Sequence, residues 1–289
     1  MTAKVSVRFW GTRGSIATPG PATQRYGGNT PCTEVLVGDK RLIIDAGTGI
    51  RALGNQLLAQ AAGKPIEAHL LIGHTHWDHI QGLPFFTPAY LPTTKLDVYG
   101  VHGTTEPFKN VLAGQMAPAY FPVGMSDMAA KLDVHELNGP FHVGDAKIAY
   151  HYLNHPGITI GFRIETPRGT ICYVSDHEPY SKLSAKNSFT MKDDNAVADF
   201  ISDADLLICE AQYTEEEYAK KKSWGHSSFA DVLALARQAR AKKLALFHHD
   251  PTHTDEMMDR FVEKCRREAE GGPTPVECLA AQEGLELTL

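Results

Sequence analysis

The 289-residue sequence contains no run of about 18 apolar residues that could cross a bilayer, and no such run marks a signal peptide near the N-terminus. It therefore predicts a protein that does not span a membrane. The cysteines are odd in number, scattered and never paired as CxxC, so we expect buried thiols in a reducing compartment, the cytoplasm, rather than a disulfide framework. They are Cys32, Cys172, Cys209, Cys265 and Cys278.

An internal repeat, a low-complexity tract and a basic stripe are also absent from the sequence, which argues against a solenoid, a disordered arm and a dedicated polyanion binder. The net charge is −6 with histidine counted as neutral. Bound divalent cations would nevertheless reverse the field locally. The chain is long enough to bury a full core, and no linker divides it, so we expect one domain over residues 1–289.

Hydrophobic periodicity predicts strands and hairpins mixed with amphipathic helices, which suggests two sheets packed face to face with helices on their outer faces. We expect strands at Lys4–Trp10, Cys32–Val37, Arg41–Asp45, Ala68–Ile72, Lys95–Tyr99, Asp133–Leu137, Lys147–Leu153, Thr159–Glu165, Gly169–Val174, Asp205–Cys209 and Lys243–Phe247. We expect helices at Ile50–Ala62, Ser228–Arg240 and Asp255–Glu270.

The most informative segment is HTHWDH at residues 74–79, directly after a predicted strand. In an extended chain residues two apart point the same way, so His74 and His76 can reach one metal ion. Asp78 and His79 fall at the following turn and can face a second position. One histidine at a strand end is more often structural, but three histidines and an aspartate packed this closely would repel on protonation. Imidazole and carboxylate are ligands of divalent metals, so the segment predicts a metal site.

HTHWDH matches the HxHxDH signature of the metallo-β-lactamase superfamily. Three further segments resemble, in order and spacing, the branch that contains ribonuclease Z and the cyclic-phosphate phosphodiesterases. They are FWGTRGS at Phe9–Ser15, RYGGNT at Arg25–Thr30 and LIIDAGTG at Leu42–Gly49. The resemblance spans nearly the whole chain. It implies an α/β (α+β) fold, a four-layer αββα sandwich, with the site at one edge between the sheets.

The resemblance also implies the remaining metal ligands. The family's histidine after a later strand is matched by His155, which ends its strand, whereas the competing His151 lies inside it. The family's bridging aspartate is matched by Asp176, and its last histidine by His248, with the adjacent His249 as the alternative. One metal ion would then be held by His74, His76 and His155, the other by Asp78, His79 and His248, with Asp176 between them.

A pair of divalent ions about 3.5–4 Å apart can share a bridging water and lower its pKa from about 15.7 toward about 7, which supplies hydroxide at neutral pH. Zinc is the default, and manganese or iron are the alternatives. Asp78 would hold a metal and orient the nucleophile. His226 is the candidate general acid, and Glu210 resembles the family residue that supports it. Alternatively His226 only caps the following helix, whose N-terminus disfavours a protonated imidazole. Ribonuclease Z relatives have a histidine before this glutamate, whereas this chain has Cys209.

Four positions have weaker assignments. Asp45 is expected to hydrogen-bond a ligand imidazole or, alternatively, to cap its strand. His177 is either a support for a ligand or polar surface, and Asn29 is placed to touch a phosphate oxygen. The stretch Phe108–Val123 either forms a lid whose aromatic residues stack on a base or packs as an ordinary loop.

The expected substrate is a small phosphodiester, such as a cyclic nucleotide or a cyclic sugar phosphate. Ribonuclease Z grips tRNA with a basic arm between the equivalents of His155 and Asp176, but only 20 residues separate them here, enough for one hairpin. A long nucleic acid is therefore not expected. The alternatives are a carboxylic ester, thioester or lactone hydrolase of the same fold, a nuclease, and a metal-dependent sensor without turnover. Relatives often form homodimers.

Overall fold

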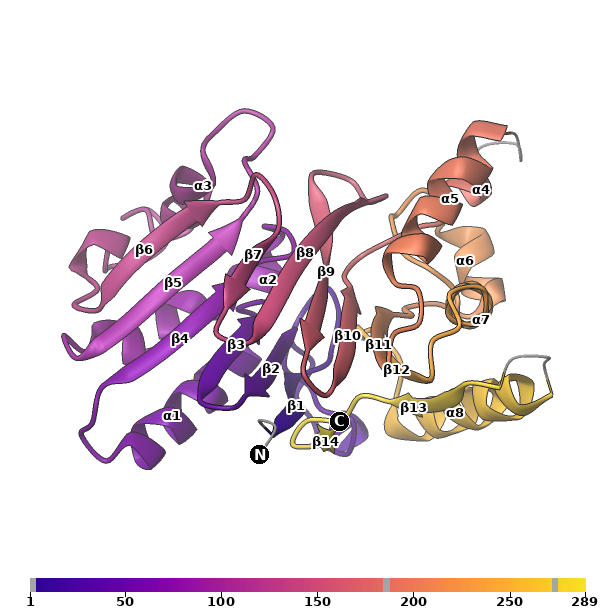
Figure 1. The fold of residues 1–289 in the computed structure, drawn as a ribbon, viewed down its shortest axis with the longest axis horizontal. Coiled ribbons are helices and arrows are strands. Elements are labelled where there is room, and N and C mark those ends of the chain that lie inside the picture. The colour runs from indigo at the N-terminus through magenta and orange to yellow at the C-terminus, as the bar shows by residue number, and fades with distance from the viewer. Residues whose placement is uncertain (1–3, 184–187, 272–274) are drawn as a thin grey trace.

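The computed structural model describes residues 4–183, 188–271 and 275–289, and within them the strands form two mixed sheets of seven strands each (Figure 1). The first sheet has the order β14-β1-β2-β3-β4-β5-β6, with β14 at Glu286–Thr288, β1 at Val5–Gly11, β2 at Cys32–Val37, β3 at Lys40–Ile44, β4 at Ile66–Leu71, β5 at Thr94–Gly100 and β6 at Lys131–Glu136. The second has the order β13-β12-β11-β10-β9-β8-β7, with β13 at Glu277–Ala280, β12 at Lys243–Phe247, β11 at Leu206–Glu210, β10 at Gly169–Val174, β9 at Thr159–Thr166, β8 at Ala146–Leu153 and β7 at Phe141–Val143.

Helices cover the outer face of each sheet, with α1 and α3 beside the first sheet and α5, α7 and α8 beside the second (Figure 1). The α-helices are α1 at Gly49–Ala61, α2 at Trp77–Ile80, α3 at Phe108–Gly114, α4 at Tyr180–Leu183, α5 at Ser188–Phe200, α6 at Glu215–Lys220, α7 at Phe229–Gln238 and α8 at Asp255–Glu270. Short 3-10 turns lie at Pro21–Thr23, Leu83–Phe85, Thr87–Tyr90 and Met125–Asp127.

Side chains alternate along each strand between the two faces of the sheet, so each face packs into a different layer of the core. On β3, Leu42 and Ile44 point between the sheets and pack with Phe162 of β9, whereas Ile43 points outward and packs beneath α1. A third cluster, which includes Val232 of α7, seals the outer face of the second sheet. This alternation follows from the two-residue period of a strand. The predicted four-layer αββα sandwich is therefore confirmed.

Parallel pairing brings the chemically important residues to one edge. Strands β3 to β6 are parallel, as are β10 to β13, so the carboxyl ends within each set lie at the same edge. Asp45 follows β3, the segment 73–79 follows β4, Asp176 follows β10, Glu210 ends β11 and His248 follows β12. Residues far apart in the sequence meet because each leaves its sheet at this edge.

All five cysteines are buried and free, as their scattered positions predicted. Within the described residues, no helix combines the length and the apolar character that a membrane span requires.

Candidate metal centre

Asp176 lies at the centre of the cluster and presents its two oxygens to two different groups of side chains. Its Oδ2 lies 3.4 Å from Nε2 of His74 and 3.7 Å from Nε2 of His155. Its Oδ1 lies 3.4 Å from Nε2 of His79 and 3.3 Å from Nε2 of His248. The structure therefore brings the predicted ligands into two groups that share one carboxylate.

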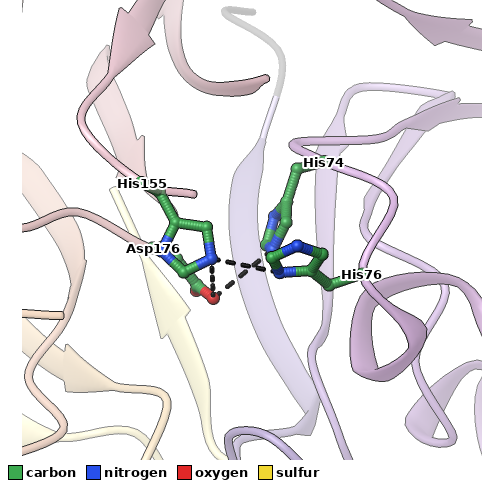
Figure 2. A group of neighbouring side chains, drawn as sticks. All are labelled: His74, His76, His155 and Asp176. Atoms are coloured by element: carbon green, nitrogen blue, oxygen red, sulfur yellow. Dashed lines mark hydrogen bonds and ion pairs between the residues drawn. The ribbon is translucent and has the colours of Figure 1, made fainter. Parts of the chain in front are cut away.

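His76 and Asp78 complete the two groups. His76 turns its Nδ1 toward Nε2 of His155 at 3.1 Å, and Figure 2 shows these rings converging with His74 on Asp176. In the other group, Oδ2 of Asp78 lies 3.0 Å from Nε2 of His248. The groups are His74, His76, His155 and Asp176, and Asp78, His79, Asp176 and His248.

The arrangement fits two divalent cations better than it fits a hydrogen-bond network. Nε2 of His74 and Oδ1 of Asp176 are buried without a hydrogen-bond partner, although buried polar atoms normally have one. Nε2 of His79 faces Nε2 of His248 at 3.3 Å, a contact between two ring nitrogens. Ligand atoms about 2.0–2.2 Å from a tetrahedral zinc ion lie about 3.3–3.6 Å apart, and the separations within the two groups, from 3.0 to 3.7 Å, scatter around that range.

The protonation states of these side chains also favour the binding of cations. Burial alone would raise the pKa of Asp176, but His248, His79 and His74 outweigh it and hold that pKa well below 3.8, so the carboxylate is ionised. Burial lowers the pKa of His74 to about 4, which leaves its imidazole neutral at neutral pH. Burial also opposes protonation of His79, yet Asp78, Asp176 and Asp45 raise its pKa well above 6.5. This negative field would equally stabilise a metal cation, which would displace the proton.

The outer ring nitrogens of the ligands are held by specific acceptors. Oδ2 of Asp45 lies 2.8 Å from Nδ1 of His79, and Nδ1 of His155 lies 2.8 Å from the carbonyl oxygen of Gly225. The side-chain oxygen of Gln212 lies 3.0 Å from Nδ1 of His248. Such contacts fix the tautomer and direct the other nitrogen into the cluster. The expected contact of Asp45 with a ligand imidazole is therefore present.

Sequence reasoning missed Gln212 and Ser15. Nε2 of Gln212 donates to Oγ of Ser15 at 3.2 Å, and the Ser15 backbone N–H donates to Oδ2 of Asp78 at 2.8 Å. The two residues thus connect Asp78 with His248. An amide and a hydroxyl carry no metal-ligand signature. The glycine-rich turn in the sequence could have indicated this close approach, because a Cβ at Gly14 would lie 2.3 Å from Nδ1 of His248.

His226 lies beside the candidate metal ligands and does not cap the helix α7. The N-cap of α7 is Ser228, whose side chain accepts from the backbone N–H of Asp231, so the capping alternative for His226 is wrong. Nδ1 of His226 lies 3.8 Å from Oε2 of Glu210, and its ring centroid lies 5.1 Å from that of His155. Burial lowers the pKa of His226 to about 3.

Glu210 is buried, and backbone N–H groups hold its carboxyl in place. Its Oε1 accepts from Ser227 at 2.6 Å and His177 at 3.3 Å, and its Oε2 accepts from Gln212 at 3.2 Å. Burial raises its pKa well above 4.5, with a further contribution from Asp176. The preceding Cys209 lies in the core beneath the helices of the second sheet, so it takes no part in this contact.

Three of the residues considered above lie away from the cluster. Nε2 of His249 lies 2.9 Å from the carbonyl oxygen of Ala281, and the half-buried His151 stacks on Phe200. The expectation that Asn29 touches a phosphate oxygen stays a prediction. Its Nδ2 donates to Glu283 at 2.9 Å and its Oδ1 accepts from Thr48 at 3.0 Å, so two separate segments of the chain occupy the two ends of the amide.

His177 is buried rather than on the polar surface, and its Nδ1 accepts the backbone N–H of Asn154 at 3.1 Å. In the stretch Phe108–Val123, Phe108 and Met116 are buried in the core. These side chains anchor the first part of the stretch on the domain, whereas residues 118–120 are exposed. Its role as a lid stays a prediction.

Residues 40–249 match the family model described as a beta-lactamase superfamily domain. A ribonuclease Z of Haloarcula marismortui is 24% identical over 99% of this chain and 96% of its own length. Among solved structures, the metallo-beta-lactamase fold protein YhfI from Bacillus subtilis superposes with a TM-score of 0.69 at 19% identity and covers 100% of both chains. A diphosphatase from the PhnP family superposes with a TM-score of 0.66 at 17% identity, covering 100% of this chain and 98% of its own. The chain therefore belongs to the beta-lactamase superfamily, and it is a metal-dependent hydrolase of the metallo-β-lactamase fold.

Proposed function

We propose that this protein is a dinuclear metal-dependent phosphodiesterase that hydrolyses a small phosphodiester, with a cyclic nucleotide or a cyclic sugar phosphate as its substrate class. The observation that carries the proposal is the position of Asp176 between two groups of ligands. His74, His76 and His155 would hold one ion, and Asp78, His79 and His248 the other. Zinc is the first choice and manganese or iron the alternatives, because the donors are imidazole and carboxylate without thiolate.

The ligand groups open on a hollow of about 500 Å³. It is lined by Ser15, His76, Trp77, Asp78, His155, Pro156, Asp176, Ser223, Trp224 and His226. None of these residues is a lysine or an arginine, so the charge of a bound phosphate has to be met by cations in the cluster. When bound, such cations supply a water of lowered pKa and neutralise charge on the phosphoryl and leaving oxygens.

The chain's own residues would position the reactants and move a proton. Asp78, held by the Ser15 N–H at 2.8 Å, orients the attacking water. His226 faces the leaving oxygen, with Glu210 behind it. Because burial lowers its pKa to about 3, His226 is neutral in the free protein. An entering phosphate favours its protonated form, and the proton then passes to the leaving oxygen.

A small substrate is favoured over tRNA by the connection between His155 and Asp176. It consists of the hairpin β9–β10, and residues 167–168 between the two strands leave no room for a basic arm. The net charge of −6 also disfavours a long polyanion. The names of the ribonuclease Z relative and of the PhnP-family diphosphatase support cleavage of phosphate esters as the reaction.

The proposal is tested by assaying metal-replete protein with bis-p-nitrophenyl phosphate and p-nitrophenyl acetate, then with cyclic and linear nucleotides. Turnover of bis-p-nitrophenyl phosphate supports the phosphodiesterase. If His226 is the acid, turnover of a nucleotide, whose sugar oxygen leaves only with a proton, falls at least about 100-fold in His226→Ala with the metal content retained. Turnover of the acyl ester alone would favour a carboxylic ester hydrolase. Stable metal binding without turnover of either ester would favour a sensor.

A further inference from the structure

Two tryptophans are exposed at the rim of the hollow that the candidate metal ligands line. Trp77 is 78% exposed and Trp224 is 61% exposed, whereas Trp10, the remaining tryptophan of the chain, is 8% exposed. Both Trp77 and Trp224 line the hollow together with His155 and His226. Large apolar side chains left in water beside a catalytic hollow mark a surface that another molecule covers.

The backbone around Trp224 is built to hold the indole in place. The carboxylate of Glu178 is fully buried, and it accepts the N–H of Ser223 and the N–H of Gly225, both at 2.9 Å. Ser223 has a φ of 71° and Gly225 a φ of 87°, both in the left-handed region. One buried carboxylate thus fixes the chain on either side of Trp224, although the side chain itself packs into no core.

Trp77 is held in place by its neighbours in the sequence and by a backbone hydrogen bond. It stands between the ligand residues His76 and Asp78, and its carbonyl oxygen accepts the N–H of Gln81 at 2.7 Å at the start of α2. His76 faces His155 and Asp78 faces His248, whereas the indole of Trp77 between them is exposed at the rim. Both exposed indoles therefore sit on ordered backbone, which lowers the entropy lost when a ligand binds.

We propose that Trp77 and Trp224 bind the aromatic base of the substrate, so that the phosphodiester cleaved here is a nucleotide rather than a sugar phosphate. This inference rests on the phosphodiesterase function proposed above. Apart from the cluster and His226, the hollow is lined by the two indoles, Pro156, Ser15 and Ser223. Such a wall offers ring faces to a base but few hydrogen-bond partners to the hydroxyl groups of a sugar.

The sequence pointed to the stretch Phe108–Val123 for base stacking, and its role as a lid stays a prediction. Phe121 of the stretch Phe108–Val123 is occupied by an edge-to-face contact with Phe85, with ring centroids 5.4 Å apart. Tyr120 is exposed, but it does not line the hollow. Among the residues that line the hollow, Trp77 and Trp224 are the aromatic ones besides the histidines.

The test compares two esters with the same leaving group, thymidine 5′-(p-nitrophenyl phosphate) and methyl p-nitrophenyl phosphate. We expect the ratio of their kcat/KM values to fall about 5- to 150-fold in Trp77→Ala or Trp224→Ala, since stacking of one base is worth about 1–3 kcal/mol. Trp77→Phe and Trp224→Phe should recover most of the ratio. Tyr152→Ala, a matched change of a 53% exposed aromatic residue on β8, should leave the ratio unchanged.

An unchanged ratio in both alanine variants would overturn the inference. Dissociation of a dimer in Trp224→Ala at a constant ratio would also overturn it, because Trp224 would then contact a second copy of the chain. A second measurement separates this inference from the proposed function. If metal-loaded protein hydrolyses neither ester, calorimetric titration with AMP and ribose 5-phosphate still decides it. At least tenfold tighter binding of AMP, lost in Trp224→Ala, supports base binding, and equal affinities contradict it.

Discussion

Oδ2 of Asp45 lies 2.8 Å from Nδ1 of His79, and both side chains are fully buried. The same carboxylate accepts the N–H of Gly73 at 2.8 Å and the hydroxyl of Tyr173 at 2.7 Å. Asp45 has a φ of 63°, an uncommon backbone conformation for a residue other than glycine. The end of β3 therefore orients a ligand that the loop after β4 supplies.

Asp45→Asn should weaken metal binding about 10- to 100-fold, because an amide nitrogen would then face groups that need an acceptor. The measurement is a competition titration of the metal against a chromogenic chelator. Tyr173→Phe is the control, since it removes one donor and leaves the carboxylate. It should cost about 0.5–1.5 kcal/mol of unfolding free energy and retain both metals. Equal metal affinity in Asp45→Asn and the unmodified protein would refute this role of Asp45.

Adjacent histidines should behave differently when each is replaced. His248→Asn removes a ring nitrogen that lies 3.3 Å from Asp176, so the affinity for one metal should fall more than about 100-fold. His249→Asn should keep two metals, because Nε2 of His249 faces the carbonyl oxygen of Ala281. Metal content after dialysis against limiting chelator distinguishes the two variants. The reverse pattern would make His249 the ligand.

Two glycines with the same backbone conformation differ in what lies around them. Gly225 and Gly63 both have a φ of 87°. A Cβ at Gly225 would lie 2.2 Å from Nδ1 of His155, whereas nothing lies within 4 Å of one at Gly63. Gly63→Ala should lower the free energy of unfolding in urea by about 1–2 kcal/mol, because only the left-handed backbone conformation disfavours the added methyl group. Gly225→Ala should lower the free energy of unfolding by more than this, and it should also weaken binding of the metal that His155 would hold. Equal costs and equal metal content would show that the close approach does not matter.

Stability in acid should depend on Glu217, away from the metal centre. Burial alone would raise its pKa, but the Thr214 N–H at 2.7 Å and Nε2 of His253 at 2.9 Å outweigh it and hold that pKa below 4.5. A carboxyl with a lowered folded-state pKa stabilises the protein above its unfolded-state pKa, and this contribution is lost as the pH falls through the folded-state value.

The Tm of Glu217→Gln should therefore be lower than that of the unmodified protein at neutral pH, and the difference should shrink between about pH 5 and pH 3. Glu216→Gln, an exposed neighbour in the same turn, serves as the control and should leave the pH profile nearly unchanged. A Tm difference for Glu217→Gln that stays constant down to pH 3 would contradict the lowered pKa.

The structure brings the predicted ligands together. The residue pattern indicated the HTHWDH segment after its apolar strand, whereas His155, Asp176 and His248 were assigned through the family resemblance. The strand Lys243–Phe247 and the helix Asp255–Glu270 have the predicted bounds. Periodicity failed where tertiary context decides. The helix α5 at Ser188–Phe200 went unnoticed, since only Val197 and Ala198 of its residues are buried. The edge strands β7 and β14 have three residues each, too few for a period to show.

Hydrogen-bond partners were harder to predict than ligands. The partner of Asn29 went unnoticed because nothing near it in the sequence indicates that Glu283, 254 residues away, accepts a hydrogen bond from its amide. Gln212 went unnoticed for the same reason, since its partner His248 lies 36 residues along the chain. Histidine and aspartate indicate a metal ligand by their residue type, whereas the side-chain amide of Asn or Gln can hydrogen-bond to almost any polar group.

The most direct test of the account is the number of metal ions bound per chain. Protein loaded with zinc or manganese and freed of excess ion should contain two metals per chain by inductively coupled plasma mass spectrometry. Asp176→Ala should retain fewer, because this carboxylate faces both groups of ligands. Protein that takes up no transition metal, or an Asp176→Ala variant that holds two ions as tightly as the unmodified chain, would contradict the account.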